Sequence, residues 1–244
     1  GTANVWAREI GIPIRTPLRP DAVQDAAELL VDGQRRVVDL GRVNDLYFLM
    51  WAGIGFDAEV TVEVERRPEA KRRLGALAFA IAALAHTLNL RGNRANLILD
   101  GQKLSQRVLL IVASNIQLYG GIMRLAPAAS LNDGLLDICV FQGYSGLAAY
   151  RHFFSILLGL HMRSPEVTYL QGRRLIVEAS RPLPVHADGD SIGTTPVTIE
   201  IVPSFLQVIV PQRRTSLALR LEGAARHPSV ADALAEFWKR IRRQ

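Results

Sequence analysis

A succession of short β-type segments constrains the fold of this chain more than any other feature. From residue 36 onward, apolar and β-branched residues gather in short runs that are separated by turn residues. The predicted strands are residues 36–40, 46–56, 95–99, 107–114, 135–141, 174–179, 185–188, 197–202 and 206–210. Asp100-Gly101 lies between two of them and predicts a hairpin turn. We therefore expect a mainly β (α+β) fold, a layered β-sandwich with inserted helices.

Helical periodicity marks the segments between and around these strands. The predicted helices are residues 5–12, 21–30, 69–88 and 147–160, and a last helix that begins at Pro228-Ser229. The longest apolar run, residues 74–85, is shorter than the roughly 20 residues that cross a bilayer. We therefore expect a soluble or peripheral protein that does not span a membrane.

The net charge of +6 is concentrated in two places. Residues 66–73 hold five cations against one acid, and the segment after Pro211 holds eight against three. Two local patches fit anionic lipid or phosphate better than a long nucleic-acid groove, although each could also be a solvated face. The C-terminal helix could lie on a membrane, pack on its own domain or bridge two protomers of a homodimer. The single cysteine, Cys139, cannot form an internal disulfide, belongs to no zinc-binding sequence pattern, and suits a reducing, cytoplasmic compartment.

Two acidic turns carry the candidate chemistry. Asn132-Asp133-Gly134 opens directly into a strand with a second acid, Asp137, so carboxylate and carbonyl oxygens could converge there on a hard cation. Asp188-Gly189-Asp190 follows another strand, and its two carboxylates could divide the roles of base and positioning group. Both patterns are also ordinary turn chemistry.

The order of motifs along the chain resembles the soluble bacterial diacylglycerol kinase and lipid kinase family, whose members are relatives of sphingosine kinase. The matching motifs are Gly1-Thr2-Ala3-Asn4, Gly53-Ile54-Gly55-Phe56-Asp57-Ala58, Tyr119-Gly120-Gly121, Pro127, Asn132-Asp133-Gly134-Leu135-Leu136-Asp137 and Asp188-Gly189-Asp190. The resemblance implies a remnant of an N-terminal α/β nucleotide-binding domain in residues 1–30. It further implies the C-terminal domain of the diacylglycerol kinase/NAD kinase-like fold in residues 31–211. Residues 212–244 would be a connector and a basic amphipathic helix.

The resemblance also implies an activity, the transfer of the γ-phosphoryl group of ATP to a lipid hydroxyl with Mg²⁺. In this interpretation Asp190 stands at the position of the general base and Asp188 is the other acid of the same motif. Nucleotide contacts would come from Gly1, Thr2 and Asn4. Magnesium would be held by Asp133 with the backbone carbonyls of Ser130 and Leu135. The partners would be a lipid substrate and the anionic inner face of the cytoplasmic membrane, with no nucleic acid.

Two residues depart from the family pattern. Val5 stands where the family usually has Asp, and Asp190 is one methylene shorter than the family's Glu, so its carboxylate lies roughly 1.5 Å nearer the backbone. These departures keep open a non-catalytic lipid-binding or regulatory domain. A kinase of the NAD-kinase sort with a soluble substrate is a second alternative. The acceptor lipid is not encoded in any motif.

Overall fold

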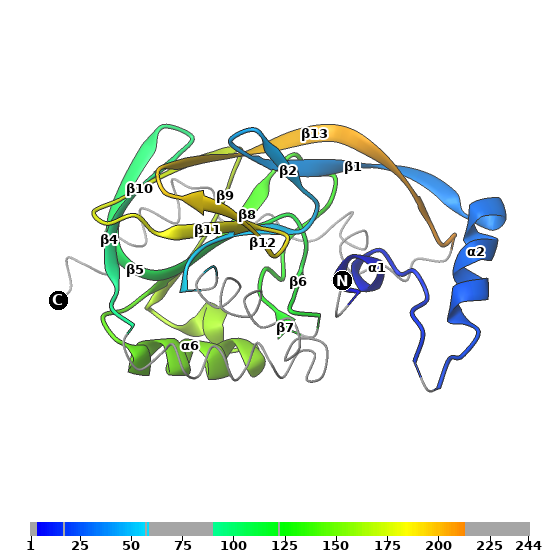
Figure 1. The fold of residues 1–244 in the computed structure, drawn as a ribbon, viewed down its shortest axis with the longest axis horizontal. Helices are drawn as coiled ribbons and strands as arrows, with labels where there is room; N and C mark the ends of the chain where they lie inside the picture. The colour runs from blue at the N-terminus through cyan, green and yellow to red at the C-terminus, as the bar shows by residue number, and fades with distance from the viewer. Residues whose placement is uncertain (1–3, 17, 57, 59–89, 122, 213–244) are drawn as a thin grey trace.

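The computed structural model describes residues 4–16, 18–56, 58, 90–121 and 123–212 (Figure 1). Gly1 and Thr2 lie outside these residues. So do the predicted helix 69–88, both basic patches and the C-terminal helix.

Strands dominate the described part of the chain. Eleven of them form one antiparallel sheet: β1 (Gln34–Val43), β2 (Leu46–Phe48), β3 (Trp51–Gly55), β4 (Asn93–Leu99), β5 (Gln102–Ser114), β8 (Leu136–Gln142), β9 (Val167–Gly172), β10 (Arg174–Ala179), β11 (Pro184–Ala187), β12 (Asp190–Thr194) and β13 (Val197–Val210). A separate small pair is formed by β6 (Leu118–Tyr119) and β7 (Met123–Arg124). The helices are α1 (Val5–Glu9), α2 (Ala22–Asp32), α6 (Gly146–Leu157) and the short η1 (His161–Arg163).

The sheet curls so that its two ends approach each other (Figure 1). The strand order is β12-β11-β3-β5-β4-β10-β13-β1-β2, and β8 leaves this path by pairing with β5 and β9. Strands β2 and β3 are consecutive in the chain but lie in different parts of this order, so the turn between them crosses from one end of the sheet to the other. The mainly β fold class is confirmed, and the layers belong to one continuous curled sheet.

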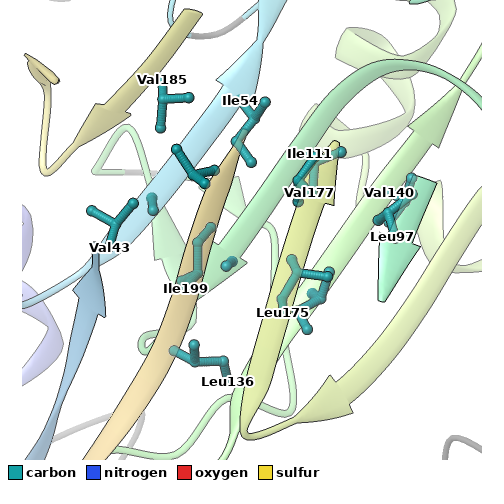
Figure 2. Packing of buried hydrophobic residues seen from close by; sticks show 14 of the residues in the cluster. Val43, Ile54, Leu97, Ile111, Leu136, Val140, Leu175, Val177, Val185 and Ile199 are labelled. Atoms are coloured by element: carbon teal, nitrogen blue, oxygen red, sulfur yellow. The ribbon is translucent and has the colours of Figure 1, made fainter. Parts of the chain in front are cut away.

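The larger apolar core lies on one face of this sheet (Figure 2). Side chains at alternate positions of each strand enter it, as in Leu136, Ile138 and Val140 of β8. Leu175 and Ile199, which pair across β10 and β13, are fully buried in it. Burial of aliphatic side chains of this kind is the main stabilising term of the domain.

A second core lies on the opposite face. Cys139 and Phe141 of β8 alternate with the residues above and meet Leu125 and Ile156. Ile10, the residue directly after helix α1, belongs to this core. Cys139 is buried, as its apolar surroundings in the sequence predict.

The observed strands differ from the predicted ones in several places. Residues 46–56 form two strands with a turn at Leu49-Met50, because the chain changes partners there. Residues 197–202 and 206–210 form one strand, β13, which continues past Ser204 by means of a bulge. Strands β6, β7, β9 and β12 were not predicted. Strand β12 is mostly exposed, so it has no buried face to produce alternation.

Candidate active site

The Asp188-Gly189 hairpin is a rigid element at the closing edge of the curled sheet. Asp188 and Gly189 have φ of 50° and 98°, and both signs are those of a two-residue type I′ turn. The Asp188 carboxylate accepts backbone N–H groups of Leu49 at 2.6 Å, Met50 at 2.8 Å and Trp51 at 3.1 Å. The hairpin is thereby fixed to the β2–β3 turn.

These contacts define what Asp188 can do. Both of its carboxylate oxygens already accept hydrogen bonds, so little acceptor capacity is left for a substrate proton. Burial raises the pKa of this carboxyl group, while the three N–H donors and His186 oppose the rise. His186 is buried, and its Nδ1 accepts the Gly189 N–H at 3.2 Å. The geometry suits a positioning role for Asp188.

Asp190 is placed differently on the same hairpin. It is the first residue of β12, pairs with Ala187 of β11, and is exposed. Within the described part of the chain its carboxylate has no hydrogen bond or ion pair. The hairpin thus presents one carboxylate to solvent on a backbone that the other carboxylate holds in place.

The second acidic turn, residues 130–135, lies against β1. Asp133 is exposed and accepts the Leu135 N–H at 3.0 Å, and the Ser130 hydroxyl donates to the Asn132 side-chain oxygen at 3.0 Å. Partial burial within the loop is the main reason that the pKa of Asp133 is raised to about 6, although the residue keeps an exposed face. The nearby carboxylate of Asp39 contributes less to this rise.

Asp39 anchors this turn and was missed by the sequence reasoning. It is 2% exposed, and its carboxylate accepts the N–H groups of Gly134 and Ser204, each at 2.7 Å. Its own N–H donates to Leu131 O at 2.7 Å. The available signal was an acid within the apolar run Val37-Val38-Asp39-Leu40, because a charge buried in a strand is costly unless it is fully hydrogen-bonded.

Asn115 connects the two acidic turns and was also missed. Its side-chain amide donates to the carbonyls of Asp39 and Leu49, both at 3.0 Å, and its N–H donates to Met50 O at 2.8 Å. Because Leu49 and Met50 donate their N–H groups to Asp188, hydrogen bonds run without a break from the Asp39 turn to the Asp188 hairpin. The two motifs, more than fifty residues apart in the sequence, are thus linked through hydrogen bonds.

Asp137 adds a further carboxylate beside this network. It pairs with Ser114 of β5, which in turn pairs with Trp51 of β3. It is fully buried, and one oxygen accepts the Tyr169 hydroxyl and the Gln171 amide while the other has no partner among the described residues. Burial, aided by the charge of Asp133, raises its pKa to about 7.

The donor set of the predicted magnesium site fits a hard cation. A carboxylate and two backbone carbonyls are oxygen ligands, and the neighbouring carboxylates leave negative charge that a divalent ion would offset. Among the described residues no three His, Cys, Asp or Glu side chains form a metal-binding group, so Asp133 would act with carbonyls.

Two further motifs lie near this site or at its margin. Tyr119 of the Tyr119-Gly120-Gly121 loop packs against Trp51, with ring centroids 5.0 Å apart, beside the Asp188 hairpin. Asn4, the described member of the predicted nucleotide contacts, is exposed at the start of α1 and has a φ of 47°.

Comparison with known proteins identifies related chains over most of this sequence. A family model described as the YegS C-terminal NAD kinase beta sandwich-like domain matches residues 51–210. A diacylglycerol kinase of Mycobacterium tuberculosis (strain H37Rv) is 34% identical over 218 residues, which cover 87% of this chain and 67% of that protein. A diacylglycerol kinase of Bacillus subtilis (strain 168) is 28% identical over 214 residues and is covered to 68%.

Solved structures share the fold. A crystal structure of a diacylglycerol kinase from Bacillus anthracis strain Sterne matches with a TM-score of 0.59 at 18% identity, covering 87% of this chain and 65% of that one. A second structure from the same organism matches with a TM-score of 0.68 at 23% identity, covering 87% of this chain and 68% of that one.

In the described residues we find no helix long and apolar enough to cross a membrane.

Proposed function

The chain belongs to the bacterial diacylglycerol kinase and lipid kinase family, and on that premise we propose that it takes part in ATP-dependent phosphorylation of a lipid hydroxyl. The acceptor class is diacylglycerol-like, an apolar lipid with one free hydroxyl group. The observation that carries this proposal is the division of roles on one hairpin. Asp188 is held by three backbone N–H groups, whereas Asp190 is exposed and unpaired among the described residues.

Asp190 takes the role of general base in this proposal. The lipid hydroxyl oxygen forms a bond to the γ-phosphorus of ATP, the bond from that phosphorus to the bridging oxygen breaks, and its electrons stay on ADP. The hydroxyl proton passes to the Asp190 carboxylate, directly or through one water. Asp188 and Asn115 keep the hairpin in register with the β2–β3 turn, so the base does not have to be positioned anew in each cycle.

Asp133, with the carbonyls of Ser130 and Leu135, would hold Mg²⁺ in the second turn. A bound Mg²⁺ supplies positive charge that offsets the surrounding carboxylates. The Asp39 carboxylate holds this turn by accepting the Gly134 N–H. The Asn115 amide, which donates to the Asp39 carbonyl, connects the turn to the hairpin. Nucleotide contacts from Gly1, Thr2 and Asn4 belong to the same proposal.

Phosphate transfer from labelled ATP tests the proposal. The full-length gene product, its Asp190→Asn variant and the control Asp45→Asn would be assayed in mixed micelles that contain Mg²⁺ and diacylglycerol, phosphatidylglycerol or a long-chain base. Asp45 is an exposed acid in the β1–β2 turn, remote in sequence from the hairpin. We expect transfer to one lipid, abolished by Asp190→Asn and unchanged by Asp45→Asn.

Two results would overturn parts of this proposal. Transfer that persists in Asp190→Asn would retain the kinase and remove Asp190 as its base. No transfer to any lipid by a folded protein that still binds vesicles would favour the non-catalytic lipid-binding domain, for which the shorter side chain of Asp190 and Val5 are the sequence arguments.

A further inference from the structure

Helix α6 presents most of its large apolar side chains to solvent, and Ile156 is the large apolar residue that it buries. Ala148, Ala149 and His152 are buried, whereas Leu147, Phe154 and Leu158 are 78%, 56% and 67% exposed. A helix that packs on a globular core normally has the opposite arrangement. Positions 147, 154 and 158 lie on one face, because steps of seven and four residues nearly complete whole helical turns.

The exposed apolar face continues beyond the helix at both ends. Nearly half of the exposed large hydrophobic side chains of the described residues lie between residues 144 and 160. The α6 surface is defined here as Tyr144, Leu147, Phe154, Leu157, Leu158 and Leu160. Each of these residues is at least 45% exposed. Exposed apolar side chains gathered in one segment in this way mark an interaction site.

Arginines surround the α6 surface. Arg107 lies over the Tyr144 ring at 5.0 Å, and Arg91 forms a β-bridge with Ser145 at the start of the helix. Arg151 is on the helix itself, and Arg163 is exposed in η1. An acid, Glu166, lies among these four arginines and forms an ion pair with Arg151.

We propose that the α6 surface docks on an anionic lipid bilayer. Its apolar side chains would enter the boundary between headgroups and acyl chains, and its arginines would meet lipid phosphates. A second copy of the chain fits less well, because a two-fold contact through this surface would bring together two surfaces that are both bordered by arginines. The inference rests on the proposed function in one respect, that the acceptor lipid resides in a membrane.

Vesicle sedimentation tests the docking surface. The probes are vesicles of phosphatidylcholine with and without phosphatidylglycerol, and the protein is the full-length gene product. The variant Phe154→Ser/Leu158→Ser removes two apolar side chains from the surface. The control Leu30→Ser/Val31→Ser removes two apolar side chains that are even more exposed, from α2, which lies at the other end of the domain (Figure 1).

We expect the wild type and the α2 control to bind phosphatidylglycerol vesicles more tightly than pure phosphatidylcholine vesicles. The α6 variant should bind at least about tenfold more weakly, since each side chain loses most of the transfer free energy of a buried Phe or Leu. Higher salt should weaken the binding of the wild type. Unchanged vesicle binding of the α6 variant would overturn the inference, as would a loss of self-association without a loss of vesicle binding.

An assay in detergent micelles separates this inference from the proposed function. With diacylglycerol dispersed in micelles, the α6 variant should phosphorylate at the wild-type rate, because docking on a bilayer is not required. If neither protein phosphorylates lipid but both bind vesicles equally, the proposed function and the docking surface both fail. If neither phosphorylates lipid and only the wild type binds, the proposed function fails and the docking surface stands.

Discussion

Replacing Asp188 by asparagine separates the structural carboxylate of the hairpin from the exposed one. Asparagine tolerates the φ of 50° and keeps one oxygen for the Met50 and Trp51 N–H groups. Its amide nitrogen then faces the Leu49 N–H, which donates at 2.6 Å in the native protein, so two donors oppose each other. The variant loses one hydrogen bond to a charged acceptor, worth about 1.5–3 kcal/mol, and two others become neutral.

Relief from the desolvation that raises the pKa of Asp188 offsets part of this loss. We therefore expect Asp188→Asn to lower the free energy of unfolding by about 2–3 kcal/mol. For a domain of this size that lowers Tm by roughly 5–10 °C. Asp190→Asn, at an exposed position, should change stability by less than about 0.5 kcal/mol.

Thermal denaturation followed by far-UV circular dichroism measures both variants under one condition. A Tm of Asp188→Asn within about 1 °C of the wild type would refute the reasoning, because the three N–H contacts would then contribute no net stability. An equally large loss in Asp190→Asn would refute the assignment of separate roles.

Two buried acids give further predictions. The pKa of Asp137 is raised to about 7, so between about pH 4 and pH 7 this carboxyl group is protonated in the folded protein and ionised in the unfolded chain. The free energy of unfolding therefore falls as the pH rises from about 4 to 7. Asp137→Asn should therefore remove roughly 2–3 kcal/mol of the stability difference between pH 5 and pH 8 in urea denaturation, and an unchanged pH dependence would contradict this. Asp39→Ala leaves the Gly134 and Ser204 N–H groups without their acceptor and should cost about 3–5 kcal/mol, whereas Asp45→Ala should cost almost nothing. Equal unfolding midpoints of these two variants would show that Asp39 does not anchor the turn.

The parts of the fold that were predicted from the sequence are those with local signals. Asp100-Gly101 forms the expected hairpin, with φ of 47° and 85°, because only a few residue types adopt this turn. Of the predicted helix 147–160, residues 147–157 are helical, but the periodicity does not say which face is buried. A solvent-facing apolar stripe has the same pattern as a core-facing one.

The connections within the site could not be predicted in the same way. The side chain of Asn115 meets Asp39 and Leu49, which are 76 and 66 residues away, and Asp39 meets Ser204, 165 residues away. These contacts follow from strand pairing across the curled sheet, and no local pattern encodes such pairing. Residues 197–202 and 206–210 were predicted as two strands, yet β13 continues through Ser204, whose N–H donates to the side chain of Asp39 at the bulge.

The central claim is that Asp190 accepts the proton of the lipid hydroxyl on a hairpin that Asp188 holds in place. The most direct measurement is kcat for Asp190→Asn, Asp190→Glu and the wild type, in one micelle assay at a temperature where all three are folded. Our account predicts a loss of about 10²–10⁴-fold in Asp190→Asn, while Asp190→Glu, which keeps the carboxylate, retains activity. Wild-type kcat in Asp190→Asn would contradict it.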